Sequence, residues 1–107
     1  MSVWYGVRDL DAARAFYTRT LGFQEVYTDD EGRWARLARD GAELALAEAP
    51  EATGAVLAVD VADVKAEAER LRGEGVEVGV VLEIPGVIRL LDVFDPDGNR
   101  LQLTQDL

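Results

Sequence analysis

Hydrophobic residues alternate with other residues at the start of the chain, and this alternation predicts a β-strand. Val3, Tyr5 and Val7 are spaced two apart, the period of a strand with one buried face. Asp9 suits the N-cap of a helix. Apolar residues then follow at helical spacing as far as Gly22, a residue that favours the left-handed end of a helix. The pattern predicts one strand followed by one amphipathic helix.

Shorter apolar stretches follow this helix. Three more strands are predicted, over residues 23–28, 34–39 and 42–47. Asp40-Gly41 between the last two is the strongest hairpin signal in the chain. Residues 50–54 contain Pro and Gly and read as a linker. The first half of the chain therefore has the order strand, helix, three strands.

The same order recurs in the second half. Residues 7–12 resemble residues 61–66, which lie about half the chain length later. Strands are predicted over residues 56–61, 76–84 and 87–94, with a helix capped by Asp63 after the first of them. The sequence thus predicts an α+β fold of two tandem βαβββ modules. They occupy about 1–50 and 55–107 of a single domain, 1–107.

A turn and a final strand end the second module. In the stretch 95–99, Asp-Pro-Asp-Gly-Asn, Pro96 presets φ for a β-turn and Gly98 can adopt positive φ. Leu101 and Leu103 then alternate with polar residues, as in a half-buried strand. The simplest interpretation of this turn is a well-formed hairpin.

Charge and composition narrow the classes of function. The chain has 21 acidic and 11 basic side chains, a net charge of −10, which argues against binding to nucleic acid. It has no Cys and no His, so thiolate chemistry and the commonest general base are both excluded. No apolar run approaches the roughly 20 residues of a membrane span, and no signal peptide is evident. A cytoplasmic protein is expected.

Three motifs together resemble those of a known family. The doubled βαβββ pattern occurs with Val-Arg-Asp-Leu before the first helix (7–10), a helix end at 16–23, and the Asp-Pro-Asp-Gly-Asn-Arg-Leu stretch (95–101). In this order they resemble the vicinal oxygen chelate superfamily, which includes glyoxalase I, bleomycin resistance proteins and extradiol dioxygenases. The resemblance implies curved mixed sheets that enclose a cleft, and a dimer.

The enzymes of this family hold a divalent metal, but this chain departs from their ligand pattern. The positions that correspond to the ligands are Ser2, Val56 and Gln102, together with a less certain one near Ala45. Divalent transition metals need imidazole, thiolate or carboxylate donors, which these residues do not supply. No metal, cofactor or catalytic residue is therefore expected.

Strand alternation predicts which side chains line the cleft. The candidate ligand-binding residues are Trp4, Trp34, Arg36, Asp60, Arg89 and Gln102. The indole rings offer flat surfaces to a planar or cationic ligand. The parity of strand 87–94 stays open, because either Arg89 and Leu91 or Leu90 and Phe94 could point into the cleft.

Three functions are compatible with this sequence. The first is a non-catalytic homodimer of the bleomycin-resistance type, which sequesters a cationic or planar aromatic small molecule, such as a cationic antibiotic. The second is a glyoxalase-like or dioxygenase-like metal-dependent enzyme whose site is built from other acids, such as Glu25, Glu43, Asp60 or Asp92. The third is an assembly role, in which side chains or a partner chain fill the cleft.

Overall fold

The chain folds into two similar halves, each with one sheet and one main helix. The computed structural model describes residues 2–50 and 56–107, so the predicted linker lies, apart from Pro50, outside the described residues. The elements of the first half are β1 (Ser2–Val7), α1 (Leu10–Ala15), η1 (Phe16–Thr20), β2 (Gln24–Asp29), β3 (Trp34–Arg39) and β4 (Ala42–Glu48). The elements of the second half are β5 (Val56–Asp60), α2 (Val64–Gly73), β6 (Leu82–Ile84), β7 (Ile88–Phe94) and β8 (Arg100–Asp106).

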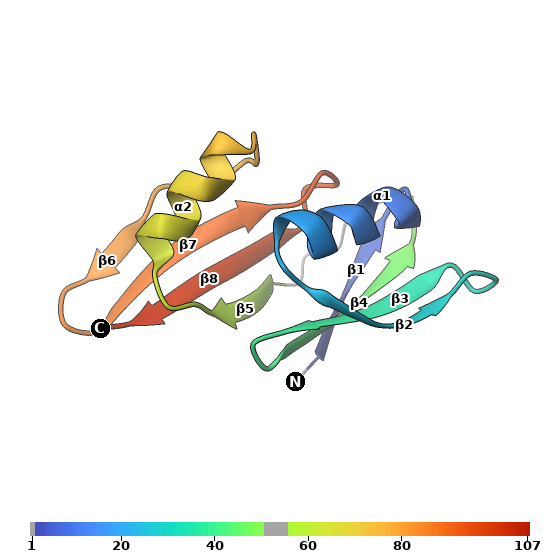
Figure 1. Ribbon diagram of the computed structural model, residues 1–107, viewed down its shortest axis with the longest axis horizontal. Coiled ribbons are helices and arrows are strands. Elements are labelled where there is room, and N and C mark those ends of the chain that lie inside the picture. The colour runs from blue at the N-terminus through green and yellow to red at the C-terminus, as the bar shows by residue number, and fades with distance from the viewer. Residues whose placement is uncertain (1, 51–55) are drawn as a thin grey trace.

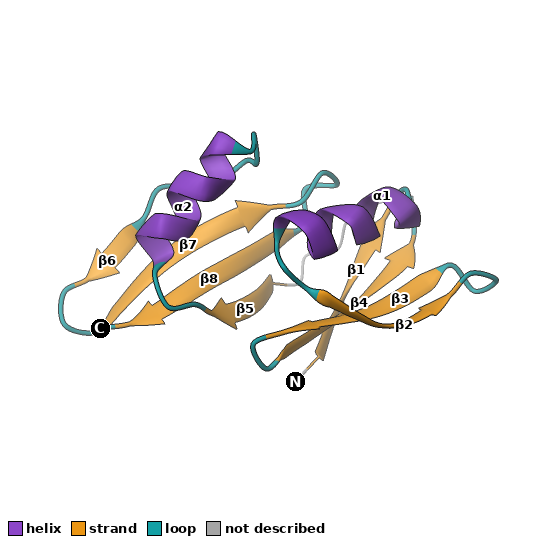
Figure 2. Ribbon diagram, in the orientation of Figure 1, coloured by secondary structure: helices purple, strands orange, loops and turns teal. Residues whose placement is uncertain are grey.

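Each half forms its own four-stranded mixed sheet. The strand order is β1-β4-β3-β2 in the first, here called sheet A, and β5-β8-β7-β6 in the second, sheet B. In both sheets the first strand pairs in parallel and the other pairs are antiparallel. This arrangement confirms the predicted α+β fold of two βαβββ units. The two sheets lie side by side in a molecule 47 × 27 × 23 Å, with both helices on the same side (Figures 1 and 2).

Successive side chains along each strand point alternately to a sheet face that a helix covers and to a face that is left open. In β4, Leu44 and Leu46 are fully buried on the helix side, whereas Ala45 between them is only partly covered. Leu101 and Leu103 in β8 repeat this pattern in sheet B. The buried side chains of the two halves form one hydrophobic cluster. The apolar stripe of each helix therefore covers one sheet face, and the opposite faces carry the remaining side chains.

The first helix is less regular than its sequence predicts. Only residues 10–15 are α-helical, and residues 16–20 continue as a π-helix in which the Leu21 amide donates to the Phe16 carbonyl at 3.2 Å. Asp9 caps the start through Ala12, as expected. Gly22 follows with a φ of +74°, the left-handed conformation predicted at the helix end. Apolar spacing does not distinguish an α turn from a π turn over so few residues.

The strand predicted within residues 76–84 occupies only the last three of them. Only β6, Leu82–Ile84, is a strand, and Val78 makes an isolated bridge to Val93. The backbone amide of Gly79 donates a hydrogen bond to the backbone carbonyl of Asp92, and the amide of Phe94 donates one to the carbonyl of Glu77. Residues 77–79 thus lie along one end of β7 and β6 along the other. The apolar sequence of this stretch reflects contact with β7 without a continuous strand.

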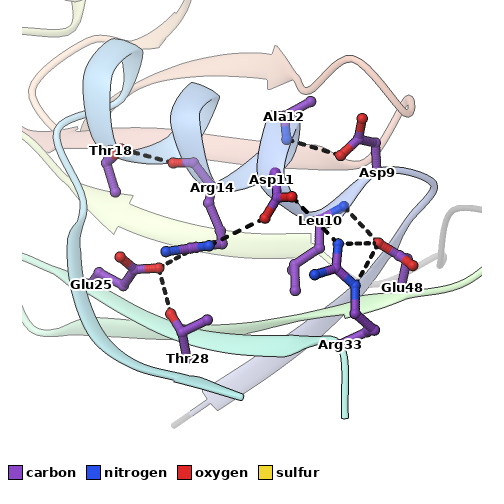
Figure 3. A network of polar contacts seen from close by, with 10 residues as sticks. All are labelled: Asp9, Leu10, Asp11, Ala12, Arg14, Thr18, Glu25, Thr28, Arg33 and Glu48. Carbon is purple, nitrogen blue, oxygen red and sulfur yellow. Dashed lines mark hydrogen bonds and ion pairs between the residues drawn. The ribbon is translucent and has the colours of Figure 1, made fainter. Parts of the chain in front are cut away.

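A network of charged side chains joins α1 to β2 and to the end of β4 in sheet A (Figure 3). The Glu48 carboxylate accepts from the Leu10 amide at 3.1 Å and from the Arg33 guanidinium at 2.8 Å. Arg33 has a φ of +53°, which is uncommon for a residue other than glycine, so its ion pair with Glu48 is made from a left-handed turn. On β2, a hydrogen bond from Arg14 lowers the pKa of Glu25. These contacts position the helix on one face only.

Candidate functional site

The open face of sheet A gathers the aromatic residues that the sequence singles out. One cross-strand row of this face consists of Trp4, Ala45, Arg36 and Tyr27. The next row pairs Trp34 with Ala47. We call these six side chains the aromatic face. Three of the predicted site residues, Trp4, Trp34 and Arg36, therefore lie on one surface.

Two aromatic walls stand on either side of an alanine floor. Trp4 on β1 is 57% exposed and Tyr27 on β2 is 53% exposed, which is unusual for such large apolar side chains. The rings of Tyr27 and Trp34 lie 5.1 Å apart at 47°. Neighbouring strands are about 4.8 Å apart, so β1 and β3 are separated by roughly 10 Å. Ala45 and Ala47 on the strand between them leave space for a flat ring.

Arg36 is the basic group of this face. It is exposed, and it makes no hydrogen bond or ion pair with any residue that the structure describes. Glu43 lies on the same face, diagonally across the β3–β4 pairing from Arg36, and no ion pair joins the two side chains. The guanidinium is thus available to a ligand on the aromatic face.

The open face of sheet B is more polar, and its Asp60, Asp92 and Arg100 side chains have partners there. Gln102 lies between Ala58 and Asp92 in one row, and its amide donates to Asp92 at 3.3 Å. Arg100 also approaches Asp92, at 3.5 Å. The predicted site residues Gln102 and Asp60 both lie on this face. The Thr104 hydroxyl donates to Asp60 at 2.7 Å.

Arg89 is separated from the other predicted site residues. Leu91 and Val93 are buried on the helix side of β7, so Leu90, Asp92 and Phe94 share the open face with Gln102. This settles the parity that the sequence left open, and Arg89 has the parity of the helix side. There it forms an ion pair with Glu83 at 2.6 Å. The partly apolar run 88–94 gave no clear alternation, because apolar side chains lie on both of its faces.

The positions that correspond to the family's metal ligands do not assemble a donor set. Ala45 lies between Trp4 and Arg36, Val56 lies beside Arg100, and Gln102 offers a neutral amide. Ser2 begins β1, and its side chain lies outside the described part. Within residues 3–50 and 56–107, no group of three or more His, Cys, Asp or Glu side chains is placed to hold a metal ion. The residues at these positions do not fit a divalent transition metal.

The two halves meet at the turn between β7 and β8, and the sequence did not predict this contact. Asp95 is 5% exposed and Asn99 is fully buried. The Tyr17 hydroxyl donates to Asp95 at 3.0 Å, and the Asn99 amide donates to the Gly6 carbonyl at 2.9 Å. The turn therefore fixes the second half against η1 and β1. No local sequence signal marks partners 78 and 93 residues apart.

A second buried tyrosine makes the same connection. The Tyr5 hydroxyl donates to the Arg100 carbonyl at 2.6 Å and accepts from the Leu57 amide at 2.8 Å. Burial raises the pKa of Tyr5 to about 12, and burial together with the Asp95 charge raises the pKa of Tyr17 still further. Both hydroxyls therefore remain protonated donors near neutral pH. The open faces of the two sheets are held in one fixed relation.

A hollow of about 560 Å³ lies at this junction, between the β3–β4 hairpin and β5. Val3, Ala42 and Ala58 form part of its lining, and Asp60 stands at its edge together with Asp40. Asp60 is thus shared between the open face of sheet B and the junction. None of the helices in the described ranges has the length and apolar character needed to cross a membrane.

Comparisons with known proteins agree with this architecture. The model of the Glyoxalase/Bleomycin resistance protein/Dioxygenase superfamily matches residues 2–103. A search of curated proteins returned no match. Among solved structures, TnmS3, an antibiotic binding protein from Streptomyces sp. CB03234, is 30% identical, with a TM-score of 0.83 over 99% of this chain and 93% of that one.

Two more distant structures share the fold. An integron cassette protein from the mobile metagenome of the Halifax Harbour sewage outfall is 25% identical, with a TM-score of 0.82 over 98% of this chain and 96% of that one. Lactoylglutathione lyase from Agrobacterium tumefaciens is 20% identical, with a TM-score of 0.81 over 98% of this chain and 91% of that one. On its sequence match and its two βαβββ units, the chain belongs to the Glyoxalase/Bleomycin resistance protein/Dioxygenase superfamily.

Proposed function

We propose that this protein binds a planar aromatic small molecule on the aromatic face and sequesters it without chemical change. The observation that carries this proposal is the pair of tryptophans on the open face of sheet A, set on either side of an alanine floor. Exposed aromatic surface of this kind favours a flat ligand, because stacking adds about 0.5–1.5 kcal/mol per ring pair to the burial of apolar area. The likeness to an antibiotic binding protein at 30% identity supports the same proposal.

The donor chemistry also favours binding over metal-dependent catalysis. Ala45, Val56 and Gln102 stand where metal ligands would be needed, and His is missing from the sequence. Asp60 and Asp92 accept hydrogen bonds from their own neighbours instead of converging on one point. This set of side chains suits a site that holds a molecule through shape and a few polar contacts.

We further propose that a second copy of the chain completes the site. The helices cover the same side of both sheets, so the two open faces of one chain lie next to each other and neither sheet covers the other (Figure 1). Exposed apolar side chains occur at both ends of the molecule, including Tyr27 in the first half and Leu82 and Ile84 in the second. A twofold dimer that places sheet A of one copy over sheet B of the other would cover the exposed apolar side chains of both halves.

A thermal-shift experiment on chelator-treated protein tests the proposed function. One arm contains Mn²⁺, Zn²⁺ or Ni²⁺, and the other contains planar aromatic antibiotics, including cationic ones of the bleomycin kind. A ligand at 100 times its Kd stabilises by about 2.7 kcal/mol, or roughly 10 °C for a domain of this size. We expect shifts in the aromatic arm only. Shifts with metal ions and none with aromatic compounds would contradict sequestration and favour the metal-dependent enzyme.

A further inference from the structure

We infer that Arg36 selects a ligand whose planar ring system carries an anionic oxygen group, so that the ligand is an aromatic carboxylate. This inference rests on the proposed function and narrows its ligand class. A guanidinium recognises a carboxylate through two parallel hydrogen bonds, a geometry that a neutral or cationic group cannot offer.

The first observation is that Arg36 has no ion pair or hydrogen bond among residues 2–50 and 56–107, although the chain is strongly acidic. Acidic side chains outnumber basic ones 21 to 11. Other arginines pair with some of these acidic side chains. Arg39 forms an ion pair with Glu67 at 2.6 Å, and Arg33 forms one with Glu48 at 2.8 Å. Arg36 forms none with the residues that the structure describes, although Glu43 shares its face. Its charge is therefore available to a ligand on the aromatic face.

The second observation is the place of Arg36 among the rings. In its own row it lies between Ala45 and Tyr27, and Trp34 stands two residues away on the same face of β3. A flat ligand that stacks on Trp34 above Ala47 would extend along the strands to the next row, where its edge would reach Arg36. A substituent at that edge would lie in the plane of the ring system, as the carboxylate of an aromatic acid does.

The third observation concerns the acids that could attract a cationic ligand. On sheet B, the Asp60 carboxylate accepts a hydrogen bond from the Thr104 hydroxyl. The Asp92 carboxylate accepts a hydrogen bond from the Gln102 amide and forms an ion pair with Arg100. A cation at either carboxylate would have to compete with these partners. The net charge of −10 acts mainly over longer distances, and exposed charges beyond about 8 Å are screened at physiological salt. The unpaired Arg36 is therefore the stronger local determinant.

Three matched probes test the inference: 2-anthracenecarboxylate, 2-(hydroxymethyl)anthracene and 2-(aminomethyl)anthracene, which are anionic, neutral and cationic. Their Kd values are measured from the quenching of tryptophan fluorescence in the full chain at 0.15 M salt. We expect the carboxylate to bind at least about tenfold more tightly than the alcohol, and the amine most weakly, since a bidentate ion pair exceeds a neutral contact.

The variant Arg36→Gln is expected to remove the preference for the carboxylate while it leaves the Kd of the alcohol within about twofold. Arg19→Gln is the matched control, because Arg19 is also exposed, lies in η1 on the helix side, and changes the net charge equally. It should leave all three Kd values unchanged.

Two outcomes would overturn the inference, and they differ in what they imply. If the alcohol or the amine binds as tightly as the carboxylate, or if Arg36→Gln keeps the preference, the inference fails but aromatic binding stands. If none of the three probes quenches the fluorescence saturably, both the inference and the proposed function fail.

Discussion

Replacing Asp95 with alanine is expected to lower the free energy of unfolding by about 3 kcal/mol or more, because several buried donors lose their acceptor and each unsatisfied one costs about 1–3 kcal/mol. Asp95 accepts hydrogen bonds from the amides of Asp97 and Asn99 at 2.9 and 2.8 Å, from the Asn99 side chain, and from the Tyr17 hydroxyl. Without the carboxylate, these donors would stay buried without acceptors. The junction between the two halves would lose its central polar group.

Urea unfolding measures this effect against two reference variants. Tyr17→Phe removes one donor and leaves Asp95 its other partners, so a loss of about 1 kcal/mol is expected. Asp106 is exposed at the end of β8, so the variant Asp106→Ala should change the free energy of unfolding by less than about 0.5 kcal/mol. A loss below about 1 kcal/mol for Asp95→Ala would show that the turn does not hold the halves together.

Replacing Trp34 with leucine is expected to weaken the binding of a planar aromatic ligand at least tenfold. Tryptophan side chains at the centre of a binding surface often contribute 2 kcal/mol or more, which exceeds the 1.4 kcal/mol that a tenfold change in Kd requires. Trp34 is half-buried and contacts Tyr27, so the variant also loosens the second ring of that wall. Its effect on unfolding should stay near 1 kcal/mol, because the core lies on the other face of β3.

Fluorescence from the remaining Trp4 reports the Kd in this variant. Val26→Ala serves as the control, since Val26 is an exposed apolar residue at the irregularity of β2, next to Tyr27, and belongs to no row of the aromatic face. It should bind the ligand as the wild type does. An unchanged Kd in Trp34→Leu would remove the aromatic face from the site.

The sequence predicts the architecture well, because two regularities of the sequence specify it. These are the alternation of apolar residues within each strand and the repeat of the whole βαβββ unit. Alternation in β3 and β4 separated Leu44 and Leu46 from Ala45, and the same period assigned Trp34 and Arg36 to the open face. The repeat of strand, helix and three strands then identified the family, which the family match confirms. These features are local, so they can be read without the fold.

Features that depend on contacts between distant segments could not be predicted. The turn at Asp95 looked like an ordinary hairpin, because its partner Tyr17 is 78 residues away in the sequence. Arg89 could not be assigned to a face, since apolar side chains occur on both sides of β7. That Arg36 has no partner in the described part of the chain is likewise a property of the folded surface, and the net charge alone suggested a cationic ligand instead.

The most direct test of sequestration by a dimer is native mass spectrometry of the wild-type protein with 2-anthracenecarboxylate. It reports the assembly, the number of bound molecules and their mass in one spectrum. We expect a species of twice the chain mass of 11.7 kDa that carries two unaltered ligand molecules, one for each aromatic face. A monomer that retains the ligand would contradict the shared site. A dimer without ligand, or one that releases a ligand of changed mass, would contradict non-catalytic binding.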